Sequence, residues 1–195
     1  GGVELDVSAV SIEDDSVMLA IGSQLTEGSL QLSYSGSTLQ DLAGNSAPNF
    51  SQIVVSDGYI RGGKVYVDID GDGIADPDEL LEGVSSNSSG EVLLEGDALA
   101  ADVIILGGVN TDTGAINELS LTAPTGYSVV NPLSTLVAQV IQKGSSEGEK
   151  TVAEAEALVI SALGLSLAEG DSLSEYDTLS DDSEAGLGNR IVTAQ

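Results

Sequence analysis

Carboxylates crowd one short stretch of the sequence, VDIDGDGIADPDE. Asp68, Asp70 and Asp72 alternate with other residues, Gly73 follows them, and Glu79 closes the stretch. This spacing matches the EF-hand calcium loop, which takes oxygen ligands from positions 1, 3 and 5, a sharp turn from glycine at 6 and a bidentate carboxylate from 12. A divalent cation would offset the repulsion among these groups. The stretch therefore predicts a Ca²⁺ site.

Two more residues of the loop complete the predicted ligand set. Ile74, at position 7, would bind through its carbonyl oxygen, and Asp76, at position 9, directly or through water. Pro77 then predicts a short helix capped by Asp76. Because the preceding segment KVYVD alternates like a strand, with Val65, Val67 and Ile69 on one face, we expect the ion to join a strand end to this helix. The alternative is an acidic surface turn without metal.

The chain as a whole is strongly acidic. Its 195 residues include 5 Lys and Arg against 32 Asp and Glu, which gives a formal net charge of -27. This charge disfavours binding to nucleic acid or to an anionic membrane surface. With neither Cys nor His, the chain has no disulfide and no thiolate metal site, and acid–base catalysis would depend on carboxylates alone. We expect no enzyme activity, no membrane insertion and no signal peptide.

The elements that must position the loop follow from the pattern of apolar residues. From Val3 to about Pro124, short alternating runs punctuated by Gly, Asn, Asp and Ser predict an antiparallel β-sandwich. Within it, Asp57-Gly58 predicts a two-residue hairpin turn. The predicted fold class is α+β: a sandwich with a C-terminal helical segment and an EF-hand-like loop.

Three helices are predicted after residue 130. The first runs through NPLSTLVAQVIQKG, residues 131–144, with Asn131 as its N-cap. The second begins with a capping box between Thr151 and Glu154 and stops at Gly164, and the third starts near Ser180. We divide the chain into partial Ig-like strands (1–56), a β-rich calcium-binding region (57–129) and a helical segment (130–195), expected to form one unit.

Several of these stretches resemble known bacterial surface proteins. DGYIRGGKVYVDIDGDGIADPDE, ILGGVNTDTG, LTAPTGYSVVNPLSTLV and ALGL resemble the ligand-binding segment of large calcium-dependent RTX adhesins of Gram-negative bacteria. GSLQLSYSGSTLQDLAGNSAPNFSQIVV resembles the last strands of SwmB-like Ig modules, whose first strands this chain lacks. The resemblance covers residues 3–165. It implies an extracellular, cell-surface module, exported by type I secretion and flanked by adhesin domains, that binds calcium ions and captures protein C-termini on other cells, as in biofilms.

A second candidate site lies in GGVNTDTGAINE, residues 107–118. Its glycines allow close backbone approach, and its polar side chains would line a ligand pocket or hold a second Ca²⁺. The candidate ligand-binding residues are Asn110, Asp112, Thr113, Asn117 and, from the following GYSVV stretch, Tyr127. A hydrogen-bonded loop between two strands is an equally open interpretation.

Two functions remain open. One is a calcium-dependent adhesin module that binds a peptide C-terminus, and the other is a calcium-rigidified spacer of a surface protein. The helical tail favours the adhesin, because a spacer sandwich gains nothing from apolar helices. Since the chain has few cations to clamp a carboxylate, we expect a Ca²⁺ ion with an open coordination position to bind it.

Overall fold

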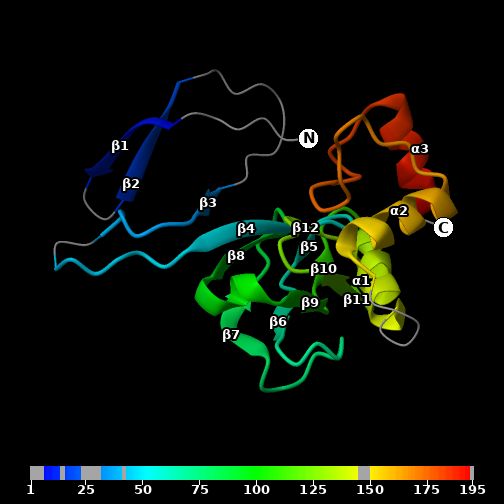
Figure 1. Cartoon of the computed structure of the whole chain (residues 1–195), viewed down its shortest axis with the longest axis horizontal. Helices are drawn as coiled ribbons and strands as arrows, with labels where there is room; N and C mark the ends of the chain where they lie inside the picture. The colour runs from blue at the N-terminus through cyan, green and yellow to red at the C-terminus, as the bar shows by residue number, and fades with distance from the viewer. Residues whose placement is uncertain (1–6, 14–15, 23–31, 41–42, 145–149, 194–195) are drawn as a thin grey trace.

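A computed structural model of the chain describes residues 7–13, 16–22, 32–40, 43–144 and 150–193. In these ranges the strands precede residue 131 and three α-helices follow it, which confirms the α+β class (Figure 1). The strands are β1 (Val7–Glu13), β2 (Ser16–Ile21), β3 (Ser33–Tyr34), β4 (Phe50–Val55), β5 (Ile60–Arg61), β6 (Lys64–Asp68), β7 (Leu80–Ser85), β8 (Glu91–Glu95), β9 (Asp102–Leu106), β10 (Val109–Asn110), β11 (Ser120–Ala123) and β12 (Val129–Val130). The helices are the 3₁₀ helix η1 (Gly96–Ala100), α1 (Pro132–Gly144), α2 (Val152–Leu163) and α3 (Glu184–Thr193).

The described strands form several small, mostly antiparallel sheets. One four-stranded sheet has the order β11-β9-β6-β7. In another, β4 pairs with β3 and β8 in antiparallel and with β12 in parallel. β5 pairs with β10, and β1 pairs with β2 in a hairpin that Figure 1 shows apart from the other sheets.

The hydrophobic core draws on both larger sheets and on the helical segment. Alternate residues of β6, Val65 and Val67, are buried on one face, as their spacing predicted, while Ile69 lies beyond the strand and is 76% exposed. Other members of the core are Ile53, Val55, Val92, Leu94, Val103, Ile105, Leu121, Val130, Leu133, Val137, Val159 and Leu173. Burying a side chain of this size stabilises the fold by about 1.5–3 kcal/mol. The core therefore joins residues from all three predicted segments.

The helix ends follow the predicted capping residues. At the start of α1, the Asn131 side chain accepts a hydrogen bond from the Ser134 amide at 2.9 Å. At the start of α2, Thr151 and Glu154 form the predicted capping box, and Gly164 ends the helix in the left-handed conformation with φ of 65°. These local predictions are confirmed because capping depends on residues only three or four positions apart.

Two local predictions are wrong. A turn does form at Asp57-Gly58, but β4 and β5 on either side of it belong to different sheets, so no hairpin results. The segment after the acidic loop is not a short helix: β7 begins at Leu80, which pairs with Tyr66 of β6. The cross-strand pairing of β7 with β6 overrides the helix signal of the proline, whose effect is confined to a turn at 77–78.

The chain after α2 is held on the body by polar side chains. Asp177, only 8% exposed, accepts hydrogen bonds from the Ser56 hydroxyl and, at 3.0 Å, from the Tyr59 hydroxyl. Arg190 of α3 donates to the backbone carbonyl oxygens of Thr178 and Asp181, at 2.9 Å each. These bonds connect the last helical segment to the end of β4 and to the turn that follows it.

Candidate calcium loop

The acidic loop connects two neighbouring strands of one sheet. Asp68 is the last residue of β6, and Glu79 immediately precedes β7. Both carboxylates are nearly buried, with exposed fractions of 4% for Asp68 and 6% for Glu79. The amide of Val67 donates to the Glu79 carbonyl at 3.0 Å, so the pairing of the strands brings the two ends of the loop together. Burial of two carboxylates without a basic partner is costly unless hydrogen bonds or a cation compensate.

Asp68 organises the first half of the loop. Its two oxygens accept from the amides of Gly71 at 2.8 Å and of Gly73 at 2.9 Å. Both glycines have positive φ, 76° and 75°, which side chains other than glycine rarely tolerate. At Gly73 an added Cβ would also meet the side chain of Gln142, so the end of α1 lies against the loop.

Glu79 closes the second half of the loop. One of its oxygens accepts from the Ile69 amide at 2.7 Å, and the other accepts from the Asp76 amide at 3.3 Å. Each oxygen of a carboxylate has two lone pairs, so these bonds leave acceptor capacity for a metal ion. The predicted bidentate ligand is therefore already oriented by the backbone of the loop.

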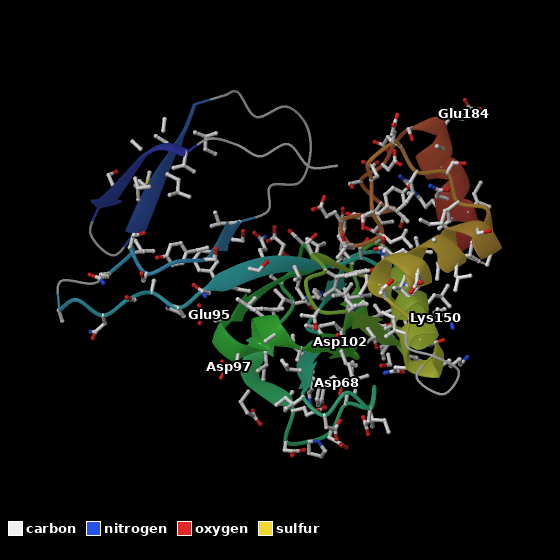
Figure 2. All side chains as sticks on the ribbon, in the orientation of Figure 1. Asp68, Glu95, Asp97, Asp102, Lys150 and Glu184 are labelled. Carbon is white, nitrogen blue, oxygen red and sulfur yellow. The ribbon has the colours of Figure 1, made fainter. Side chains whose placement is uncertain are left out.

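The other carboxylates stand on the outer side of the loop. Asp70 accepts from the Asp72 amide at 3.2 Å, and Asp72 accepts from the Ile74 amide at 2.7 Å, while the Ile74 side chain is 59% exposed. Asp76 is half-buried. Figure 2 shows Asp68 at the base of this loop, among the carboxylate side chains of its neighbours.

Two overlapping groups of carboxylates lie close enough to share a metal ion. In each group, one oxygen from every member lies within 4.8 Å of the others. The groups are Asp68, Asp70 and Glu79, and Asp70, Asp72 and Asp76. Oxygens on opposite sides of a Ca²⁺ ion with bonds of about 2.3–2.6 Å are roughly 5 Å apart. The residues present therefore fit a Ca²⁺ ion, with an all-oxygen ligand set of the kind that this cation prefers.

The electrostatics of the loop favour a cation. Burial raises the pKa of the Asp68 carboxyl, and the charges of Glu79 and Asp102 add to this rise, against the lowering by its two backbone hydrogen bonds. Desolvation and the charges of four neighbouring carboxylates raise the pKa of Asp76. Both raised pKa values mean that these carboxyl groups are harder to ionise in the folded loop. A bound divalent cation would favour their ionised form and so lower both pKa values.

Sequence reasoning did not identify Asp102, the first residue of β9. It lies directly opposite Asp68 in the antiparallel pair of β6 and β9. Like charges directly opposite each other destabilise a sheet. The register of two strands decides this proximity, and no spacing in the sequence signals it.

The predicted second site is a loop with internal hydrogen bonds. The Asn110 side chain accepts from the amides of Asp112 at 3.0 Å and Thr113 at 2.9 Å, and it donates to the carbonyl of Asp57 at 2.6 Å. Asn117, 7% exposed, bonds to the backbone of Gly107 and of Leu119. These bonds are what the interpretation as a loop requires, and the ligand-binding role stays a prediction.

Tyr127 makes its contacts in another part of the protein. Its ring is 6% exposed, and its hydroxyl donates to a carboxylate oxygen of Glu156 in α2 at 2.6 Å. Glu156 also accepts from the Ser172 hydroxyl. The hydroxyl of Tyr127 thus bonds to α2, and its side chain belongs to the hydrophobic core.

Comparisons of the chain with protein-family models, with curated proteins and with solved structures found no match. Within the described residues, the structure contains no helix of the length and apolar character that crossing a bilayer requires.

Proposed function

We propose that the protein is an extracellular, calcium-dependent module of a bacterial adhesin. The observation that carries this proposal is the acidic loop, in which six residues with EF-hand spacing connect two paired strands. Backbone amides orient four of its carboxylates, those of Asp68, Asp70, Asp72 and Glu79. The resemblance of four stretches to RTX adhesins supplies the extracellular setting. Calcium in such a setting is abundant, whereas low calcium in the cytoplasm would keep the chain loose before export.

The residues that would hold the ion are the predicted set. Asp68 and Glu79 would bind from the buried side, and Asp70, Asp72 and Asp76 from the exposed side, with the carbonyl of Ile74 as a further ligand. The ion would supply positive charge that the loop lacks, and would fix the junction of β6 and β7. Its expected affinity is that of extracellular modules, with a dissociation constant of about 10⁻⁴–10⁻³ M.

We further propose that the module captures a peptide C-terminus through calcium. The net charge of -27 repels a free carboxylate, so its capture requires a local cation. The exposed carboxylates of the loop are the better supported place for that ion, because the side-chain oxygen of Asn110 already accepts two backbone hydrogen bonds. Backbone amides of the glycine-rich loop at residues 107–114 would assist as a nest for anions.

A peptide array tests the capture. Each peptide is printed with a free C-terminal carboxylate and with a C-terminal amide, and both are probed in calcium and in chelator. The proposal expects binding that requires both calcium and the free carboxylate. Equal binding of the amidated peptides would refute capture through calcium while leaving the calcium loop itself intact.

A calcium-rigidified spacer is the second candidate. The observation that favours it is that the loop connects adjacent strands of the same sheet, so an ion there would stiffen the module along its strands. A spacer should show calcium-dependent stability and no binding on peptide or glycan arrays. The array result therefore separates the two functions.

A further inference from the structure

The strand β8 forms one edge of its sheet. It pairs along its length with β4, from Glu91 opposite Val54 to Glu95 opposite Phe50. No other described strand pairs with β8, while β4 has β3 and β12 on its second side. An edge strand presents backbone N–H and C=O groups that a further strand can use. The outer side of β8 therefore lacks a strand partner among the described residues.

The register of this pair shows which backbone groups point outward. The Val55 amide donates to the Gly90 carbonyl at 2.8 Å, and the Gly96 amide donates to the Asn49 carbonyl at 2.9 Å. Because hydrogen-bonded pairs alternate along an antiparallel ladder, residues 90, 92, 94 and 96 bond to β4, and residues 91, 93 and 95 direct their N–H and C=O groups outward. The outward groups of residue 91 are occupied, since its amide donates to Asn87 Oδ1 and its carbonyl accepts from the Asn87 amide, at 2.9 Å each.

Leu93 lies at the centre of the unpaired part of this edge. Its amide and its carbonyl have no hydrogen-bond partner among the described residues. Its side chain is 49% exposed, whereas its neighbours Val92 and Leu94 are buried in the core. Because side chains alternate between the two faces of a strand, the side chains of Glu91, Leu93 and Glu95 lie together on the outer face of the sheet.

Two carboxylates thus flank Leu93 on this face. Glu95 is exposed, and Glu91 is half-buried and accepts from the side-chain amide of Asn87 at 2.7 Å. In the described part of the chain, no Lys or Arg forms an ion pair with either carboxylate. Figure 2 shows Glu95 at the left margin of the body, away from Asp68 and the acidic loop. The outer face of β8 is therefore acidic, apolar and acidic at alternate positions.

We propose that β8 binds an extended segment of a partner protein as an added antiparallel strand. The partner residue opposite Leu93 would exchange two backbone hydrogen bonds with it, and its side chain would lie beside Leu93 on the outer face. Basic side chains two positions before and after that residue would lie opposite Glu95 and Glu91. The edge thus selects a segment in which basic residues alternate with a central apolar one. This site goes beyond the proposed function, because it needs neither calcium nor a peptide terminus.

The same charges disfavour a second copy of this chain as the occupant. Two β8 strands paired antiparallel about Leu93 would place Glu91 of each copy opposite Glu95 of the other. Like charges directly opposite each other destabilise a sheet, and the net charge of -27 adds a general repulsion between copies. A basic segment of a different protein is the occupant that both the backbone and the charge of this edge favour.

Amide NMR spectra of the whole chain, in saturating calcium, test the proposal. The probe is the peptide acetyl-Thr-Lys-Thr-Leu-Thr-Lys-Thr-amide, whose blocked ends exclude capture of a terminal carboxylate. We expect it to shift the Leu93 amide and to slow the hydrogen exchange of this amide, because the N–H gains an acceptor. The amides of Gly71 and Gly73 in the acidic loop should stay unchanged. Replacing both lysines of the peptide by glutamate should weaken its binding at least about fourfold.

Two methylated peptides test the strand pairing itself. N-methylation of the central leucine removes the donor to the Leu93 carbonyl and should abolish binding. N-methylation of the threonine that follows it should preserve binding, because the amide of that residue points away from β8. Equal binding of the two methylated peptides would overturn the proposal, as would the absence of binding by the unmethylated peptide.

Substitutions of Leu93 locate the site on the protein. Leu93→Pro removes the outward N–H without removing a bond to β4, and proline is tolerated at such edge positions, so this variant should lose peptide binding. Leu93→Ala keeps the N–H and should bind the peptide more weakly without losing it. Undiminished binding by Leu93→Pro would overturn the proposal. A dimer of the chain that Leu93→Pro disperses would assign the edge to a second copy and would overturn it as well.

Charge variants test the choice of a basic segment, and they do so even if Leu93→Pro does not fold. The double variant Glu91→Gln, Glu95→Gln should weaken binding of the lysine peptide roughly twofold to thirtyfold, the range expected for two cross-strand charge pairs. The matched control Glu118→Gln, Glu169→Gln removes the same charge from exposed positions outside β8 and should leave binding unchanged. Equal effects of the two double variants would contradict the charge pairing.

Discussion

Substitution of Glu79 by glutamine should separate the two roles of this carboxylate, as an acceptor within the loop and as a calcium ligand. In chelator, the variant loses a charge-assisted hydrogen bond from a backbone amide to residue 79. This loss lowers the free energy of unfolding by about 1.5–3 kcal/mol. The substitution also removes the repulsion with Asp68. For oxygens no more than 4.8 Å apart, this repulsion is about 3.5 kcal/mol or more at an effective dielectric constant of 20. Relief of the repulsion offsets the lost hydrogen bond, so the melting temperature in chelator should not fall.

Calcium should reveal the second role. With a dissociation constant of about 10⁻⁴–10⁻³ M and about 10 mM calcium, the ion should stabilise the wild-type protein by roughly 1.4–2.7 kcal/mol. For a chain of this size, this free energy corresponds to a rise in melting temperature of about 3–11 °C. Glu79→Gln should lose most of this rise, because it removes the bidentate anionic ligand.

Differential scanning calorimetry in chelator and in calcium measures both effects. The matched control is Glu82→Gln, which removes one exposed charge from the neighbouring strand β7 and should keep the full calcium response. A wild-type melting temperature that is the same in both conditions would refute calcium binding. A large loss in chelator with an intact calcium response in Glu79→Gln would show that Glu79 is only an acceptor within the loop.

Three further predictions concern ligand choice and pH. Asp70→Ala should weaken calcium binding in titration calorimetry, whereas Asp78→Ala, at the non-ligating position 11, should not; equal losses would contradict the ligand set. Burial and then Asp177 raise the pKa of Tyr59 from 10.0 to about 12. The stability that the protonated Tyr59 hydroxyl contributes is therefore complete below pH 10 and is lost as the pH rises toward 12. Tyr59→Phe should therefore flatten the decline in melting temperature over that range. Hydrogen bonds within the capping box lower the pKa of Glu154 below 4.5, so the stability lost in Glu154→Gln should be present above pH 4.5 and vanish as the pH falls through the lowered value.

Features that depend on neighbours in the sequence could be predicted from it. The capping box of α2 and the N-cap of α1 require partners three positions away, and the sequence places those partners directly. The spacing of Asp68, Asp70 and Asp72 with glycine likewise predicted a turn that gathers carboxylates. Local chemistry decides these structures, because a side chain with one suitable backbone partner nearby needs no help from the rest of the fold.

Features that depend on strand register could not be predicted in this way. The proline after Asp76 is an equally good signal for a helix or a turn, and the pairing of Leu80 with Tyr66 decided in favour of a turn and a strand. The Asp57-Gly58 turn joins two sheets rather than two strands of one hairpin for the same reason. The strand before the turn, β4, pairs with β8 and β12 and not with β5.

The sequence by itself determined the acidic loop with its gathered carboxylates, the presence of three helices, the caps of the first two, and an α+β chain with a core of aliphatic residues. Only the tertiary structure decided that Asp102 faces Asp68 across two strands, that the Tyr127 hydroxyl bonds to Glu156, and that the side-chain amide of Asn110 donates to the distant carbonyl of Asp57. The physical reason is the range of the interactions. Capping and turn formation act over a few residues, whereas cross-strand neighbours and burial depend on which distant segments pack together.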